Sequence, residues 1–172
     1  DLRTNNLPAT ITTTTDRREA LVDSDYVVNC TRIGGLEAFT LDIEIPLKYG
    51  IDQCVGDTIC AGGIMYAQRN IPQVLDFCSD TLELAKPGAL FINYSNPMAM
   101  NTWAALDHGA NFVGLCHGVQ NTTRQIANAL GVDKDDLHAS AAGINHQTWF
   151  VELLHKGRQI GSKELLDAYE RH

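Results

Sequence analysis

The chain has 172 residues, 44% of them hydrophobic and 20% charged, which is typical of a globular protein with a hydrophobic core. Its formal net charge of -8 argues against nucleic acid or an anionic membrane as a partner, because either would require a basic face. No apolar run is long enough to span a bilayer, and the N-terminus lacks the basic start and apolar stretch of a signal peptide.

The first part of the chain alternates between β-branched and amphipathic segments. Residues 9–15 are rich in threonine and predict a strand, and Asp16 is a suitable N-cap for a short helix over residues 17–22. The apolar run at residues 26–31 is typical of a parallel strand buried on both faces. A pair of glycines then breaks the chain before a helix expected over residues 36–49.

The middle of the chain continues this alternation. Residues 51–63 are mostly small or polar and predict a loop. A long helix over residues 64–85 follows, and Pro72 is expected to kink it. Residues 89–94 predict another buried strand, and the Asn-Pro pair after it is suited to open a helix that ends near residue 106.

The alternation of strands and helices ends in the last part of the chain. Residues 112–116 predict a strand, and residues 119–130 predict a helix. Two longer strands are then expected at residues 137–144 and 148–154, before a last helix that begins near residue 162.

This order predicts an α/β fold with a partial doubly wound, Rossmann-like parallel sheet that leads into an α+β second domain. We place the division between residues 1–133 and residues 134–172. Three expected strand ends carry polar sequence and would line one crevice, because ligands bind at the carboxyl ends of such strands. These ends are residues 30–35, 93–96 and 116–120.

A dinucleotide-binding fold normally opens with a glycine-rich turn between a strand and a helix, and this sequence has no such opening. We therefore expect the chain to start at about the third strand of such a fold. Either it binds no dinucleotide, or it is a piece of a longer protein.

The five cysteines are odd in number, form no Cys-x-x-Cys pair and lie partly within apolar runs. This usage indicates a cytoplasmic protein with free and mostly buried thiols. The cysteines are Cys30, Cys54, Cys60, Cys78 and Cys116.

Asn96 and Pro97 follow an expected strand and could serve either structure or chemistry. An asparagine before a proline often caps a helix, and the local sequence favours that interpretation. The alternative is that the Asn96 carboxamide points into the crevice, where it would offer a donor and an acceptor.

Cys116 and His146 are candidate metal ligands. Cys116 lies where a strand should meet a helix, and a helix N-terminus favours the thiolate form of a cysteine. A thiolate together with an imidazole binds a borderline divalent metal well, although a packed core cysteine is the alternative. His146 lies in a polar cluster between apolar residues, and buried polar groups need partners such as a metal or a sugar hydroxyl.

Taken together, these segments resemble glycoside hydrolase family four, which cleaves sugars with NAD rather than with two carboxylates. The resemblance is most specific in NYSNPMAMNTWA at residues 93–104, GLCHGVQ at residues 114–120 and AGINH at residues 142–146. It also includes Arg32–Gly35, Asp57-Thr58 and Gly62–Ile64. The α-galactosidase and α-galacturonidase branch is the most similar.

The resemblance implies a role for each matching residue. Cys116 and His146 match the ligands of a divalent metal, usually manganese. His117 matches a catalytic position near the leaving group, and Asn96 matches a second catalytic residue that also contacts the sugar. Asn145, together with Asn96 and His117, matches the residues that bind the substrate. The implied cofactor-binding residues are Arg32, Gly34, Gly35, Asn93 and Asn96.

The reaction implied by the resemblance is an oxidation followed by an elimination. Hydride passes from C3 of the sugar to NAD⁺, and the resulting ketone, polarised by the metal, acidifies the proton at C2. The aglycone leaves from C1, water adds, and C3 is reduced again, so the cofactor is recycled. The matching residues favour galactosides and galacturonides almost equally as substrates, with a slight preference for a uronic acid.

The resemblance also implies what the chain lacks. The family's glycine turn, ribose-binding acid and catalytic tyrosine do not occur in this sequence, so we expect the chain alone to be inactive. Cys60 stands where relatives more often have glycine. A dimer or tetramer of identical subunits is implied for the whole enzyme.

Two other classes remain open. A lactate- or malate-type 2-hydroxyacid dehydrogenase shares the fold and the turn at residues 95–97, but it uses no metal-bound thiolate. A non-catalytic nucleotide-binding module would need the missing glycine turn. The combination of Cys116 with His146 favours the glycosidase.

Overall fold

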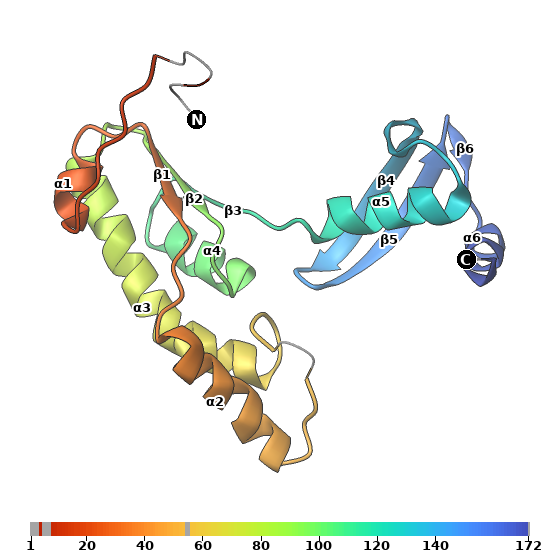
Figure 1. Cartoon of the computed structure of the whole chain (residues 1–172), viewed down its shortest axis with the longest axis horizontal. Helices are drawn as coiled ribbons and strands as arrows, with labels where there is room; N and C mark the ends of the chain where they lie inside the picture. The colour runs from red at the N-terminus through yellow and green to blue at the C-terminus, as the bar shows by residue number, and fades with distance from the viewer. Residues whose placement is uncertain (1–3, 5–7, 54–55, 172) are drawn as a thin grey trace.

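The computed structural model describes residues 4, 8–53 and 56–171 (Figure 1). The strands are β1 (Tyr26–Asn29), β2 (Leu90–Asn93), β3 (Phe112–Gly114), β4 (Leu137–Ile144), β5 (Gln147–His155) and β6 (Arg158–Gln159). The helices are α1 (Arg17–Leu21), α2 (Gly35–Lys48), α3 (Ala61–Leu84), α4 (Met98–Asp107), α5 (Gly118–Leu130), the 3₁₀ helix η1 (Lys134–Asp136) and α6 (Ser162–Glu170).

The first sheet is parallel, with the strand order β1-β2-β3; α3 and α4 pack beside it, and α1 and α2 pack against α3 (Figure 1). Asn29 of β1 is in register with Asn93 of β2, and Asn93 is in register with Gly114 of β3. The carboxyl ends of the three strands therefore meet at one edge. This arrangement confirms the predicted Rossmann-like α/β fold.

The core of this first part lies between the sheet and α3. Its buried residues are Val74, Cys78, Phe91, Ala105, Ala110 and Phe112. The rings of Phe91 and Phe112 stack with their centroids 4.9 Å apart. Helix α3 runs unbroken through Pro72 for 24 residues, so the predicted kink does not interrupt it.

Two expectations for the first part were wrong. Residues 9–15 form no strand and are exposed, because no described strand lies beside them to supply the hydrogen bonds that a β-branched segment needs. Strand β1 is not buried on both faces: Tyr26 is 70% exposed and Val28 is 65% exposed. Within the described residues β1 is an edge strand, since it pairs only with β2.

The second sheet is antiparallel, in the order β4-β5-β6, and it confirms the predicted change of architecture. A two-residue turn at Asn145 and His146 joins β4 to β5, and α5 and α6 pack near this sheet (Figure 1). The buried core residues here are Ile126, Ala127, Leu137, Leu153 and Ile160. Helix α5 thus shares its core with the second sheet, although the sequence analysis grouped it with residues 1–133.

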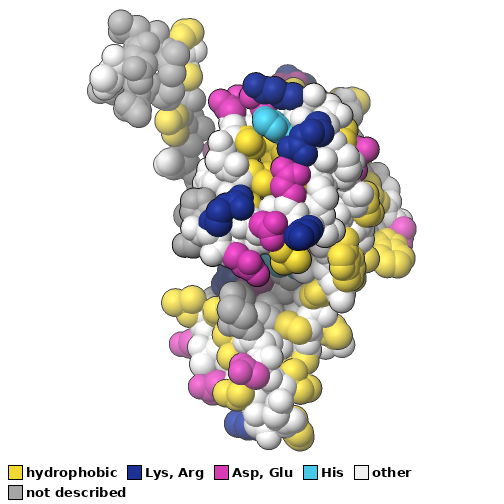
Figure 2. Space-filling model, turned by 90° about the vertical axis from the view of Figure 1, so that its right-hand side faces the viewer, with side chains coloured by type: hydrophobic (Ala, Val, Ile, Leu, Met, Phe, Trp, Pro, Cys, Tyr) yellow, Lys and Arg dark blue, Asp and Glu magenta, His cyan; other side chains and the backbone are white. Residues whose placement is uncertain are grey.

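The surface visible in Figure 2 carries charges of both signs. Figure 2 shows acidic and basic side chains intermixed over the second part of the molecule. The ion pairs of this part of the chain include Arg158–Glu164 and Lys156–Asp136. Among the described helices, none is both long and apolar enough to cross a membrane.

The described cysteines are free, but most are not buried. Cys78 is buried, Cys60 and Cys116 are half-buried, and Cys30 is exposed. The expectation of mostly buried thiols is therefore wrong for these positions, and Cys54 lies outside the described residues. Cys30 is exposed because it follows the last residue of the edge strand β1.

Candidate functional site

The carboxyl ends of β1 and β2 are joined by two asparagines. Asn29 Nδ2 donates to Asn93 Oδ1 over 2.9 Å, and Asn93 Nδ2 donates to the backbone oxygen of Ser95 over 2.8 Å. Asn93 is fully buried. Its carboxamide is thus engaged within the protein and shapes the turn after β2.

Two further buried asparagines hold the same turn. Asn70 Nδ2 donates to the backbone oxygen of Asn96 and to Asn101 Oδ1, over 3.3 and 3.2 Å. Asn101 Nδ2 donates to the backbone oxygen of Ser95 over 3.2 Å. The sequence analysis assigned no role to Asn70 or Asn101, because each is an isolated polar residue in a helix and its partners lie far away in the chain.

Asn96 is not a helix cap, so the locally favoured interpretation was wrong. The residue that precedes α4 is Pro97, which makes no side-chain capping hydrogen bond. The Asn96 carboxamide instead turns toward the loop before α3, where its Nδ2 donates to Asp57 Oδ2 over 3.1 Å. The long-range partner outweighs the local capping preference.

Arg32 reaches the same carboxylate from the loop after β1. Its Nη2 lies 3.1 Å from Asp57 Oδ2, and its guanidinium carbon lies 4.5 Å from the ring centre of Phe39 and 5.1 Å from that of Tyr66. Asp57 is buried, with 7% of its surface exposed. Asp57 therefore joins Arg32 and Asn96, two of the predicted site residues that lie 64 positions apart in the printed sequence.

The glycine loop after β1 is held by an ion pair between half-buried Arg69 and buried Asp42. Arg69 donates through Nε to the backbone oxygen of Ile33 over 3.0 Å, and through Nη2 to Asp42 Oδ2 over 2.6 Å. The Asp42 hydrogen bond raises the pKa of Arg69, so the guanidinium stays charged. Gly34 has a φ of +86°, and a Cβ there would lie 2.6 Å from Ala38 Cβ, so the loop requires glycine at this position.

His117 and Tyr94 lie side by side after β3 and β2. The Tyr94 hydroxyl is 3.4 Å from His117 Nδ1, and their ring centres are 6.3 Å apart. Both side chains are exposed. His117 directly precedes α5, so its ring is available at the edge where the strands end.

Cys116 and His146 line one cleft of about 680 Å³ between the end of the parallel sheet and the tip of the β4–β5 hairpin. The Cys116 Sγ accepts a hydrogen bond from the backbone N–H of Gly118 over 3.4 Å, at the start of α5. His146 has a φ of +63° in the hairpin turn. Met98 of α4 and Asn145 line the same cleft.

The donor set of this cleft fits a metal with open coordination positions. Cys116 and His146 offer a sulfur and an imidazole nitrogen as candidate ligands, and within the described residues no cluster of three or more His, Cys, Asp or Glu side chains adds a third. Asn145 Oδ1 is buried without a hydrogen-bond partner among the described residues, which leaves a polar atom unsatisfied beside the two ligands.

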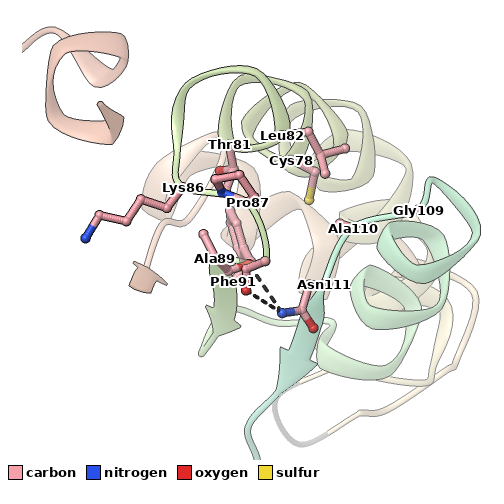
Figure 3. Close-up of a pocket in the computed structure, with 11 residues that line it drawn as sticks. Cys78, Thr81, Leu82, Lys86, Pro87, Ala89, Phe91, Gly109, Ala110 and Asn111 are labelled. Atoms are coloured by element: carbon pink, nitrogen blue, oxygen red, sulfur yellow. Dashed lines mark hydrogen bonds between the residues drawn. The ribbon is translucent and has the colours of Figure 1, made fainter. Parts of the chain in front are cut away.

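A second hollow of about 280 Å³ lies at the opposite edge of the parallel sheet, before β2 and β3 (Figure 3). Asn111 Nδ2 closes part of it by donating to the backbone oxygens of Gly88 and Ala89, over 3.0 and 3.4 Å. Burial raises the pKa of the Cys78 thiol there to about 11, so this thiol stays protonated. None of the predicted site residues lines this hollow.

Comparison with known proteins identifies the class to which this fold and cleft belong. The model of the family 4 glycosyl hydrolases matches residues 2–132. The chain belongs to that family.

Relatives within the family differ in their substrates. An alpha-galactosidase of Rhizobium meliloti (strain 1021) is 60% identical over 169 residues, which cover 98% of this chain and 34% of the relative. An alpha-galactosidase of Bacillus subtilis (strain 168) is 40% identical over 147 residues, or 84% of this chain and 34% of the relative. An alpha-galacturonidase of Thermoanaerobacterium saccharolyticum is 33% identical, covering 80% of this chain and 31% of the relative. The chain thus spans about a third of the length of these relatives.

Solved structures agree with this assignment. A 6-phospho-alpha-glucosidase from gut microorganisms, solved in complex with NAD and Mn²⁺, has a TM-score of 0.82 at 27% identity and covers 92% of this chain and 36% of that one. A malate dehydrogenase from Plasmodium falciparum has a TM-score of 0.64 at 13% identity, covering 99% of this chain and 52% of that one. The dehydrogenase likeness extends to the fold alone, and the 2-hydroxyacid dehydrogenase alternative is not favoured.

Proposed function

We propose that this chain forms the central part of an α-galactosidase that requires NAD and a divalent metal and cleaves its substrate by oxidation at C3 and elimination across C1–C2. The observation that carries the proposal is the cleft that Cys116 and His146 share. A thiolate and an imidazole, contributed by the loop before α5 and by the β4–β5 turn, face one space beside the strand ends.

The sugar in this proposal is a galactoside. The 60% identity to an alpha-galactosidase, against 33% to an alpha-galacturonidase, supports a galactoside over a galacturonide. This reverses the slight preference for a uronic acid that the sequence suggested. A bound phosphate on the sugar would need cationic partners, and the nearby cations Arg32 and Arg69 are already paired with Asp57 and Asp42.

In this proposal, different residues of the chain bind the metal, orient the sugar and hold the proton for the leaving group. Cys116 and His146 would hold the metal, and their small number leaves positions open for sugar and water oxygens, which Mn²⁺ prefers as donors. When bound, the metal would polarise the oxygens at C2 and C3. Asn96 and Asn145 would orient the sugar, and His117 would hold a proton for the departing oxygen at C1.

The cofactor would lie against the glycine loop that follows β1. Gly34 and Gly35 bring the backbone close to the start of α2, where N–H groups favour an anionic group such as a diphosphate. Arg32 would line this side of the site, and Asn93 would act by shaping the turn that carries Asn96. A homo-oligomer in the cytoplasm remains our prediction for the whole enzyme.

The test uses the full-length protein that carries this chain. Release of the aglycone from aryl α-galactoside and aryl α-galacturonide is measured with and without NAD⁺, Mn²⁺ and a thiol reductant. We expect release to require all three and to be faster from the galactoside. The same reaction in heavy water should place deuterium at C2 of the product, because that proton exchanges during elimination.

Two outcomes would count against the proposal. Release that ignores both NAD⁺ and metal would indicate an ordinary hydrolase. Release without deuterium at C2 would exclude elimination, even if NAD⁺ were required. Faster release from the galacturonide would overturn only the choice of sugar.

A further inference from the structure

We propose that Asp57 is a positioning residue that fixes the orientation of the Asn96 carboxamide, so that Asn96 presents its oxygen and not its nitrogen to the sugar. The proposal rests on the proposed function for the identity of the ligand. The orientation itself follows from the contacts around Asp57.

The Asp57 carboxylate accepts hydrogen bonds on both of its oxygens. Its Oδ2 receives Arg32 Nη2 and Asn96 Nδ2, each over 3.1 Å, and its Oδ1 receives the Thr58 hydroxyl over 3.1 Å. An ionised carboxylate only accepts hydrogen bonds, so the group that Asn96 turns toward it must be the NH₂. The assignment of nitrogen and oxygen in this carboxamide is therefore decided by its partner.

Packing keeps the carboxylate in this position. Asp57 is 7% exposed, and the backbone of Thr58 presses against the start of α3, where a Cβ on Gly63 would lie 2.6 Å from the Thr58 carbonyl carbon. Arg32 lies over the rings of Phe39 and Tyr66 and supplies the opposite charge. Asp57 therefore meets Asn96 from a buried position in which Arg32 pairs with its charge.

The consequence concerns the free end of Asn96. With Nδ2 engaged by Asp57, and with no donor on Oδ1 within the described residues, the oxygen is the available end of the half-buried carboxamide. A carbonyl oxygen accepts a hydrogen bond from a sugar O–H and cannot bind a sugar oxygen that lacks its proton. Asn96 would therefore hydrogen-bond a sugar hydroxyl before it is oxidised, and it would make no hydrogen bond to the ketone oxygen that replaces that hydroxyl.

The test is a double-mutant cycle between Asp57→Asn and Asn96→Ala in the full-length protein. An amide at position 57 can donate or accept, so it no longer dictates the orientation of Asn96. We expect Asp57→Asn to lower kcat/KM for aryl α-galactoside by about 10–100-fold in the wild-type background. In the Asn96→Ala background the same change should cost less than about threefold, because the group that it orients is gone.

Asp42→Asn is the matched control. It also replaces a buried carboxylate that is paired with an arginine, and Asp42 makes no hydrogen bond to Asn96 in the described structure. Its effect on kcat/KM should be the same in both backgrounds. An equal loss for Asp57→Asn in the two backgrounds would overturn the proposal, since Asp57 would then act independently of Asn96.

A measurement without substrate separates this proposal from the proposed function. With ¹⁵N-labelled asparagine, the side-chain NH₂ signal of Asn96 should be protected from solvent exchange in the wild type and in Asp42→Asn. Asp57→Asn should abolish that protection. A signal that Asp57→Asn leaves unchanged would overturn the orientation, whether or not the enzyme cleaves galactosides.

Discussion

At the scale of single residues, the central feature is that the two candidate metal ligands come from different sheets. Cys116 follows the parallel sheet, and His146 forms the turn of the antiparallel hairpin. Replacing either residue removes a candidate ligand and leaves no cavity in a core, because Cys116 is half-buried and His146 is exposed.

We predict that Cys116→Ser and His146→Ala each weaken Mn²⁺ binding by more than about tenfold, as measured by calorimetry on the full-length protein. The melting temperature without metal should change little. Cys30→Ser and His138→Ala are the controls, since both residues are exposed and neither lines the cleft. Unchanged Mn²⁺ affinity in both ligand variants would remove the metal site from this cleft.

The sequence could identify part of the site at this scale. Asn96, Cys116 and His146 stand in short polar motifs next to strand ends, so their chemistry is visible locally. The sequence indicates Asp57 only through the family resemblance, and it gives no signal that Asp42 or Arg69 belongs to the site. Their importance depends on partners 25–39 positions away, such as Asp57 with Arg32 and with Asn96, and single-sequence patterns do not reveal such pairs.

At the scale of elements, ion pairs hold α1 against α3. Arg17 and Arg18 both contact the Asp80 carboxylate, and Asp16 caps α1 by accepting from the backbone N–H groups of Arg18 and Glu19. Burial opposes the ionisation of Asp80, but the hydrogen bonds from Arg17 and Arg18 outweigh it and lower the pKa of this carboxyl.

This lowered pKa predicts a pH-dependent attachment of α1. A carboxyl whose pKa is lower in the folded state stabilises that state above its unfolded pKa of about 4, and the stabilisation is lost as the pH falls through the folded pKa. Asp80→Asn should therefore lower the melting temperature by at most a few degrees at pH 7, and by less near pH 3. Asp76→Asn is the control, because Asp76 is more exposed. An equal loss at both pH values would contradict the charge-based attachment.

The boundaries of most helices and strands could be predicted from the sequence. Which strands pair with one another, and how deeply each is buried, could not. The predicted strand at residues 137–144 and the predicted helix start near residue 162 agree with β4 and α6. The segment at residues 9–15 failed because strand propensity cannot supply a neighbouring strand. Burial of β1 failed for a related reason, since an apolar run does not show whether its strand has one neighbour or two.

At the scale of the whole molecule, the two sheets have separate cores. The core between the parallel sheet and α3 and the core between the second sheet and α5 share no residue. We predict that Leu153→Ala lowers the local stability of β4 and β5 by about 2–5 kcal/mol, because it leaves a cavity beside α5. Amide hydrogen exchange should speed up in those strands and stay unchanged in β1–β3.

Phe91→Ala supplies the reciprocal measurement. It removes the buried ring that stacks on Phe112, so exchange should speed up in β1–β3 and stay unchanged in β4 and β5. If either substitution accelerated exchange in both sheets equally, the two cores would unfold as one cooperative unit.

The backbone of His146 has a conformation that is unfavourable for a residue with a side chain. A φ of +63° is more comfortable for glycine than for histidine, and the left-handed conformation costs a side chain roughly 1–2 kcal/mol. A hairpin selected only for durability would place glycine at this tip. If His146 is the metal ligand that we propose, the molecule accepts a weaker turn to keep a nitrogen donor in the cleft, and variants selected only for thermal resistance would tend to lose this histidine.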